Sequence, residues 1–221
     1  MANFFPEWTN QLPWKLVVCA GVLSAALVAG ITYYFTPKYT RVGYEPTQPV
    51  PFSHALHVQQ LGMDCRYCHS FVEVASHSNV PSVQTCMSCH TQVKTDSPKL
   101  EPIRAAWNDG KADGPPVNWV RIHQLPDYVY FNHAVHVNRG VSCYSCHGNI
   151  NEMSVVYQHE PQSMAWCLTC HRAPENFLRP PDKVFDLTWK AGSAQEQWEL
   201  GTKLQKEWSV SPPVTCGGCH R

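Results

Sequence analysis

The sequence carries no net charge and no concentration of either sign. Lysine and arginine together number 17, aspartate and glutamate also number 17, and charged residues make up only 15% of the chain. A protein without a basic field lacks the electrostatic attraction that nucleic acid binding relies on, and one without an acidic run has no solvating tail. We therefore expect no nucleic acid partner, and we expect local surface features to determine partner choice.

Long apolar runs are also missing, with one exception near the N-terminus. The chain contains 18 prolines and 12 glycines in 221 residues, and both residue types interrupt regular structure. This composition predicts short helices within irregular backbone, with little or no β-structure.

What the sequence has instead is one motif in five copies, Cys-x-x-Cys followed directly by His. The copies, which we number motifs 1 to 5, are Cys65-x-x-Cys68-His69, Cys86-x-x-Cys89-His90, Cys143-x-x-Cys146-His147, Cys167-x-x-Cys170-His171 and Cys216-x-x-Cys219-His220. This is the attachment signature of c-type haem, in which both thiols bind the porphyrin and the His is an axial ligand. We therefore predict five covalently bound haem c groups, which would form most of the core.

Two other uses of paired cysteines fit less well. Zinc ribbons combine two Cys-x-x-Cys pairs in one tetrahedral site, which leaves one of five pairs over and does not explain the following His. A disulfide framework leaves the histidines unexplained as well. Ten of the eleven cysteines lie in the motif, and the remaining one, Cys19, lies in the apolar run.

The apolar run predicts a membrane anchor. From Trp14 to Phe35 the only charged residue is Lys15, and a helix of this length spans roughly 33 Å, enough for a bilayer core of about 30 Å. No A-x-A-like cleavage site follows, so we favour an uncleaved anchor over a cleaved signal peptide. Residues 1–12 are then a cytoplasmic segment, 13–36 the transmembrane helix in contact with membrane lipid, and 37–50 a linker. Because c-type haem is attached outside the bacterial cytoplasmic membrane, the remainder is predicted to be periplasmic.

The rest of the chain repeats itself. Phe-x-His-x-x-His precedes motif 1 at Phe52 and motif 3 at Phe131, and in each case a single His and a second motif follow. This pattern predicts a first two-haem module at 51–93, a linker at 94–125 and a second module with three haems at 126–221.

Outside the motifs the sequence has enough histidines to give every iron a second axial ligand. Two histidines three residues apart lie on one side of a helical turn and can face two different haems. Six histidines recur at matching places in the two repeats and are predicted ligands: His54, His57, His77, His133, His136 and His159. His123 lies outside the repeat and is an open case. Methionine (Met63, Met153 or Met164) is the competing ligand, but plentiful histidine favours bis-His coordination.

The Phe-x-His-x-x-His element ahead of the attachment motif resembles the class III multihaem cytochromes. The resemblance implies that His54 pairs with His69, His57 with His90, His133 with His147, His136 with His171, and His159 with His220. It implies no partner for His77.

The whole architecture resembles the pentahaem subunit of bacterial alternative complex III, a quinol oxidoreductase. The resemblance covers nearly all of the chain. It implies partner subunits: an iron–sulfur or molybdopterin-like subunit, integral membrane subunits and a monohaem cytochrome c. It also implies that this chain relays electrons and has no catalytic residue of its own.

Two alternatives belong to other functional classes. A catalytic multihaem reductase needs a haem with an open face, often marked by Lys in place of the motif His, whereas all five motifs here keep His. A stand-alone membrane quinol dehydrogenase of the anchored multihaem type usually has four haems and a Met soon after the first motif. Here Ser70 and Phe71 follow that motif.

One further helix is predicted at 186–208, which is rich in helix formers. Its tryptophans, Trp189, Trp198 and Trp208, favour packing, and we expect it to cover the protein's own core rather than a partner.

Overall fold

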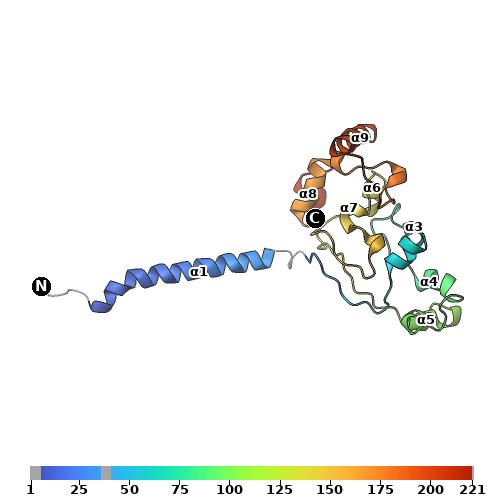
Figure 1. Ribbon diagram of the computed structural model, residues 1–221, viewed down its shortest axis with the longest axis horizontal. Coiled ribbons are helices and arrows are strands. Elements are labelled where there is room, and N and C mark those ends of the chain that lie inside the picture. Colours follow the sequence, from blue (N-terminus) through green and yellow to red (C-terminus); the bar gives the residue numbers. More distant parts are fainter. Residues whose placement is uncertain (1–5, 36–40, 221) are drawn as a thin grey trace. The chain divides into compact units, whose positions relative to one another are not determined.

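The computed structural model describes residues 6–35 and 41–220 and divides into two compact units, Met1–Arg41 and Val42–Arg221 (Figure 1). Within the described residues the regular elements are helices, and the only β-type pairings are two isolated bridges, Val129 with His220 and Val141 with Leu178. The predicted fold class, one apolar N-terminal helix and a domain of short helices and loops, is confirmed.

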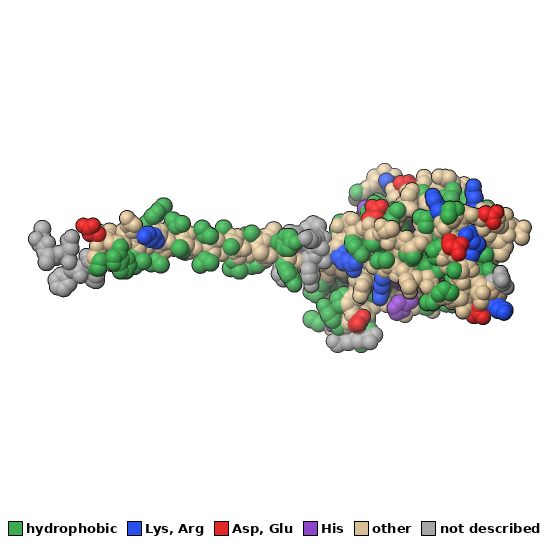
Figure 2. All heavy atoms as spheres, turned by 90° about the horizontal axis from the view of Figure 1, so that it is seen from below, with side chains coloured by type: hydrophobic (Ala, Val, Ile, Leu, Met, Phe, Trp, Pro, Cys, Tyr) green, Lys and Arg blue, Asp and Glu red, His purple; other side chains and the backbone are tan. Residues whose placement is uncertain are grey.

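The first unit is dominated by one helix. A short 3₁₀ turn, η1 (Glu7–Gln11), leads into α1 (Leu12–Phe35). Together they form a segment that is long and apolar enough to cross a membrane, and none of it is buried by other parts of the protein. In the view of Figure 2, apolar side chains lie along the length of this helix. The predicted limits that fall at 1–5 and 36–40 lie outside the described residues.

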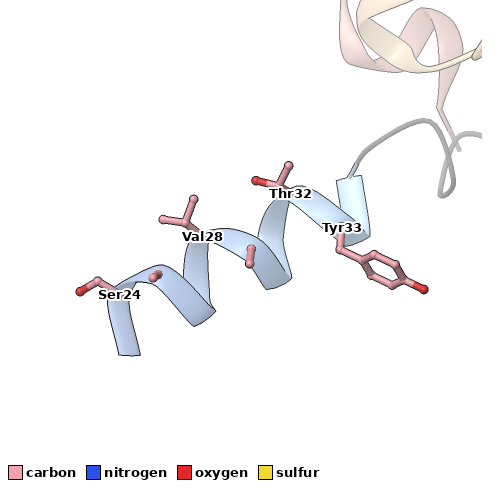
Figure 3. Close-up of a pocket in the computed structure, with 6 residues that line it drawn as sticks. Ser24, Val28, Thr32 and Tyr33 are labelled. Atoms are coloured by element: carbon pink, nitrogen blue, oxygen red, sulfur yellow. The ribbon is translucent and has the colours of Figure 1, made fainter. Parts of the chain in front are cut away.

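One face of α1 is hollowed. Ser24, Val28, Thr32 and Tyr33 line this shallow depression together with two alanines (Figure 3). The small side chains of one exposed helix produce the depression.

The second unit consists of short elements joined by irregular backbone, in keeping with its 15 prolines. In chain order the elements are η2 (Ala55–Gln60), α3 (Cys65–Cys68), α4 (Val83–His90), η3 (Pro98–Leu100), α5 (Glu101–Trp107), η4 (Asn108–Gly110), α6 (His133–Val137), α7 (Tyr144–His147), η5 (Ile150–Glu152), α8 (Met164–Arg172), η6 (Pro174–Asn176), η7 (Pro181–Lys183), α9 (Ala194–Glu207) and α10 (Cys216–Cys219). The motifs lie on α3, α4, α7, α8 and α10, so every attachment motif forms a helical turn.

The apolar core of this unit is small. One cluster contains Val50, Met87 and Ile103, and a second contains Val72, Val137 and Val184. Many large apolar side chains next to the motifs stay exposed, including Tyr67, Phe71, Val74, Val135 and Met164. Even with the other buried apolar residues, few apolar side chains are fully buried in the described part of this unit, so protein side chains alone supply little of the buried apolar area that stabilises a domain of this length.

The two predicted modules are joined by backbone hydrogen bonds. The amide of Ala55, before motif 1, donates to the carbonyl of Met153, after motif 3 (3.1 Å). The amides of His133 and Ala134 donate to the carbonyls of Ser76 and Ala75 (3.1 and 3.2 Å). Segments far apart in the sequence therefore support one another within one compact unit.

Helix α9 packs onto the short turn η6 through a glycine. Ser193 accepts a hydrogen bond from the amide of Glu196 (3.1 Å) and so fixes the beginning of the helix. Gly201 is buried, and a Cβ added to it would overlap the backbone carbonyl of Glu175. The side chain of Gln197 also donates to the carbonyls of Glu175 and Leu178 (3.1 and 2.9 Å). The helix thus packs against its own chain, as expected from the sequence.

Replacing Gly201 with valine is expected to destabilise the second unit. The added side chain would have to push α9 away from backbone atoms that cannot move aside, at a cost of about 1–3 kcal/mol. In a protein of this size, where 1 kcal/mol shifts Tm by about 2–4 °C, that corresponds to a fall in Tm of roughly 2–12 °C. Thermal unfolding followed by circular dichroism measures it, with the exposed Lys203→Ala substitution on the same helix as control. An unchanged Tm in Gly201→Val would show that α9 does not pack through this glycine.

Candidate haem-attachment sites

The Phe-x-His-x-x-His element has the same geometry in both places where it occurs. Phe52 meets His54 edge-on (ring centroids 4.9 Å apart, 89°) and stacks on His57 (4.5 Å, 23°). Phe131 meets the two following histidines at 4.7 Å and 86°, and at 4.8 Å and 26°. The phenylalanine therefore holds both imidazoles at a fixed angle, which explains its place in the pattern.

Two of these histidines face motif histidines across a similar separation. The ring centroids of His57 and His90 are 6.3 Å apart, and those of His136 and His171 are 6.2 Å apart. A metal–imidazole bond of about 2.0 Å puts the centroids of two imidazoles on opposite sides of one metal roughly 6 Å apart. Both separations fit an iron between the two rings.

Most of these imidazoles are hydrogen-bonded in a way that prepares Nε2 for a metal. In six of them Nδ1 lies 2.7–2.9 Å from a backbone carbonyl: His57, His69, His90, His133, His136 and His171. A carbonyl can only accept, so the proton resides on Nδ1, and Nε2 keeps its lone pair.

Burial keeps several of the imidazoles neutral. Together with a smaller contribution from nearby histidines, it lowers the pKa of His54 and His123 to about 4 and that of His147 to about 3. Burial also lowers the pKa of His133 and His136. Neutral imidazole is the form that binds a metal, so these side chains need not lose a proton at neutral pH.

The centre of the unit brings together two histidines that no repeat relates. The rings of His123 and His147 are perpendicular, with centroids 4.3 Å apart, and His147 Nδ1 lies 3.3 Å from His123 Nε2. His147 is thus the motif histidine whose Nδ1 meets another side chain instead of a carbonyl. The repeat pattern could not identify this contact, because His123 lies in the segment between the modules.

The remaining predicted ligands have more varied surroundings. His133 donates from Nδ1 to the carbonyl of Ser76 (2.9 Å), whose hydroxyl lies 3.0 Å from Nδ1 of His77. His77 therefore sits beside the second module, although it belongs to the first. The pairing of His133 with His147 that the resemblance implies stays a prediction.

The last implied pair is His159 with His220, and each of these two rings has contacts with other residues. The ring of His159 lies over Gly148, where an added Cβ would come within 2.6 Å of it, and its Nε2 is 3.6 Å from Glu160. The ring of His220 lies 5.6 Å from that of Tyr128. The pairing of His159 with His220 likewise stays a prediction.

The motif cysteines are unbridged, and in the described residues no group of three or more His, Cys, Asp or Glu side chains could hold a bare metal ion. Two further observations fit a large apolar cofactor. Large apolar side chains beside the motifs are exposed, and Nδ1 of His54 is buried without a hydrogen-bond partner. The donor set, two thiols and one neutral imidazole per motif, suits haem c.

Comparison with known proteins shows the family to which the chain belongs. Residues 50–106 and 129–221 match the family model of cytochrome c7 and related cytochrome c. The chain is also 37% identical over 100 residues to the multihaem cytochrome c subunit of menaquinone reductase from Nitratidesulfovibrio vulgaris, and the alignment covers 45% of each chain. The chain thus spans less than half the length of that relative. Because the family model matches more than half of the chain, including all five motifs, this protein belongs to the family of cytochrome c7 and related multihaem cytochromes c, which transfer electrons.

Proposed function

We propose that the chain carries five bis-His haem c groups and relays electrons between them, without a catalytic residue of its own. Haem iron supplies reversible one-electron chemistry when bound. The chain's residues supply the rest: thiols that attach the group, imidazoles that fill both axial positions, and carbonyls that hold those imidazoles in orientation. The observation that carries the proposal is the 6.2–6.3 Å separation of two facing imidazole pairs.

The proposed ligands combine the geometry with the resemblance to class III cytochromes. His57 and His136 serve motifs 2 and 4, because their rings face His90 and His171. His54 serves motif 1, in keeping with its electrostatic interaction with His69. His133 and His159 are proposed for motifs 3 and 5, and His77 remains a further candidate. The two-module organisation, 51–93 and 126–221, is supported by the matching phenylalanine–histidine geometry.

We further propose that α1 is an uncleaved anchor that holds the haem domain on the periplasmic side of a bacterial membrane. Its apolar surface, unburied by the protein, supports contact with lipid. The expected result is a chain that stays in the membrane pellet after alkaline carbonate washing and whose intact mass includes residues 1–35. A washed-out chain that begins after residue 35 would instead identify a cleaved signal peptide.

The complex that we propose is quinol-oxidising and similar to alternative complex III, with partners of the iron–sulfur or molybdopterin type, integral membrane subunits and a monohaem cytochrome c. A second candidate has a specific observation in its favour. The relative from Nitratidesulfovibrio vulgaris is a subunit of a menaquinone reductase. In such a complex electrons would pass through the chain towards quinone instead of away from it.

Purification of the native complex by a tag on this chain tests both candidates. We expect co-purifying membrane and iron–sulfur subunits and menaquinol-dependent reduction of the haems. Reduction of quinone by pre-reduced complex, without menaquinol oxidation, would favour the reductase. Quinol turnover by this chain without any partner would contradict the subunit assignment.

A further inference from the structure

We infer that the five attachment motifs form one unbranched row in space in the order 2–1–3–4–5, which differs from their order in the sequence, so that motifs 2 and 5 are the two ends of the electron path. The inference rests on the proposed electron relay and adds its route.

Motif 1 lies between motifs 2 and 3. Towards motif 2, the hydroxyl of Tyr67 lies 2.9 Å from that of Ser88, so the residues between the cysteines of both motifs touch. Towards motif 3, the side chain of Asn138 donates to the carbonyl of Glu73 (2.8 Å). Val72, three residues after His69, packs against Val137 in the helix that precedes motif 3. In Figure 1, α3 lies between α4 and α7.

Motif 4 lies between motifs 3 and 5. His136 accepts a backbone bond from Val141 (3.0 Å), just before motif 3, and its ring faces His171 of motif 4. Nδ1 of His171 lies 2.7 Å from the carbonyl of Pro213, three residues before motif 5.

The exposure of the motif cysteines agrees with the proposed order of the motifs. Among the motif cysteines only Cys89 and Cys216 are exposed, and they belong to motifs 2 and 5. At the centre, Cys143 and Cys146 are half-buried, and Ser142 directly before them is fully buried. In such a path, electrons enter and leave at the exposed end haems, and the protein separates the middle haems from partner proteins.

Electron paramagnetic resonance of the full-length, haem-loaded chain tests the order through two matched variants. Methionine as axial ligand raises a haem's potential, so His57→Met and His136→Met each allow one haem to be reduced first and become diamagnetic. In His57→Met, an end of the row, this reduction should change the relaxation of one remaining haem. In His136→Met, an internal position, it should change two.

Two affected neighbours in His57→Met would overturn the order, because a sequential row 1–2–3–4–5 makes motif 2 internal. A chain with fewer than five haems, or one whose haems cannot be reduced, would contradict the proposed function itself. Five reducible haems with the wrong coupling pattern would contradict the order alone. Iron positions in a cryo-electron microscopy map of the full chain in a lipid nanodisc give the same comparison directly.

Discussion

Replacing His136 with alanine is expected to convert one of five low-spin haems to a high-spin form. The His136 ring faces His171 at 6.2 Å and donates from Nδ1 to the carbonyl of Asn132, which leaves the lone pair of its Nε2 for a metal. Loss of the ligand leaves the iron of motif 4 with one strong axial bond. A high-spin signal near one fifth of total iron, measured by electron paramagnetic resonance of the oxidised protein, is the expected result.

Two companion variants sharpen this experiment. His57→Ala should give the same change at motif 2, because its contacts with Phe52 and His90 repeat those of His136. Val135→Ala, an exposed neighbour on α6, should leave all haems low-spin. If His136→Ala stays fully low-spin, the pairing with His171 is wrong.

Removing the attachment cysteines of motif 3 is expected to prevent folding, whereas removing those of motif 5 should leave a folded protein with four haems. Motif 3 contacts segments that lie later in the sequence. Ser142, just before the motif, donates to the carbonyl of Val184 (2.7 Å), and the buried Arg179 lies over the ring of Tyr144. Cys216 is exposed instead. A total stability of about 5–15 kcal/mol cannot absorb the loss of the central part of the core.

The measurement compares Cys143→Ala/Cys146→Ala with Cys216→Ala/Cys219→Ala. Haem-stained gels and limited proteolysis report attachment and folding in the same samples. The motif 3 variant should be degraded during expression, and the motif 5 variant should persist with four haems. Equal behaviour of both variants would show that position in the row does not determine the contribution to stability.

The sequence was sufficient for features that depend on local chemistry. The attachment motifs needed only residue type and spacing, and the apolar helix needed only its length and composition. The confirmed fold class followed from frequent proline and glycine. In each case the physical cause acts between residues that are close in the sequence, so the sequence pattern alone can predict the feature.

Helix α9 illustrates how far such local reasoning goes. The segment 186–208 was predicted as one helix, but α9 begins only at Ala194. The carboxylate of Asp186 accepts hydrogen bonds from the amides of Thr188 and Trp189 (both 3.1 Å), which turns the backbone before the helix. Ser193, with Glu196 three residues later, is an N-terminal capping signal that was already present in the sequence.

The contact between His123 and His147 shows what sequence reasoning could not reach. His123 lies outside the repeat, and the folded chain brings it to His147 across 24 positions. The spatial order of the motifs has the same origin, because it depends on contacts such as Tyr67 with Ser88 and His171 with Pro213. These contacts join residues that are far apart in the sequence, so no periodic pattern in the sequence predicts them.

The central claim is that each of five motifs binds one haem c covalently. Intact mass spectrometry of the denatured, full-length chain tests it most directly, because thioether bonds survive denaturation. We predict a single species whose mass equals that of the polypeptide plus five haem groups. A predominant species with fewer haems, or with none and bound zinc in the native protein, would contradict the account.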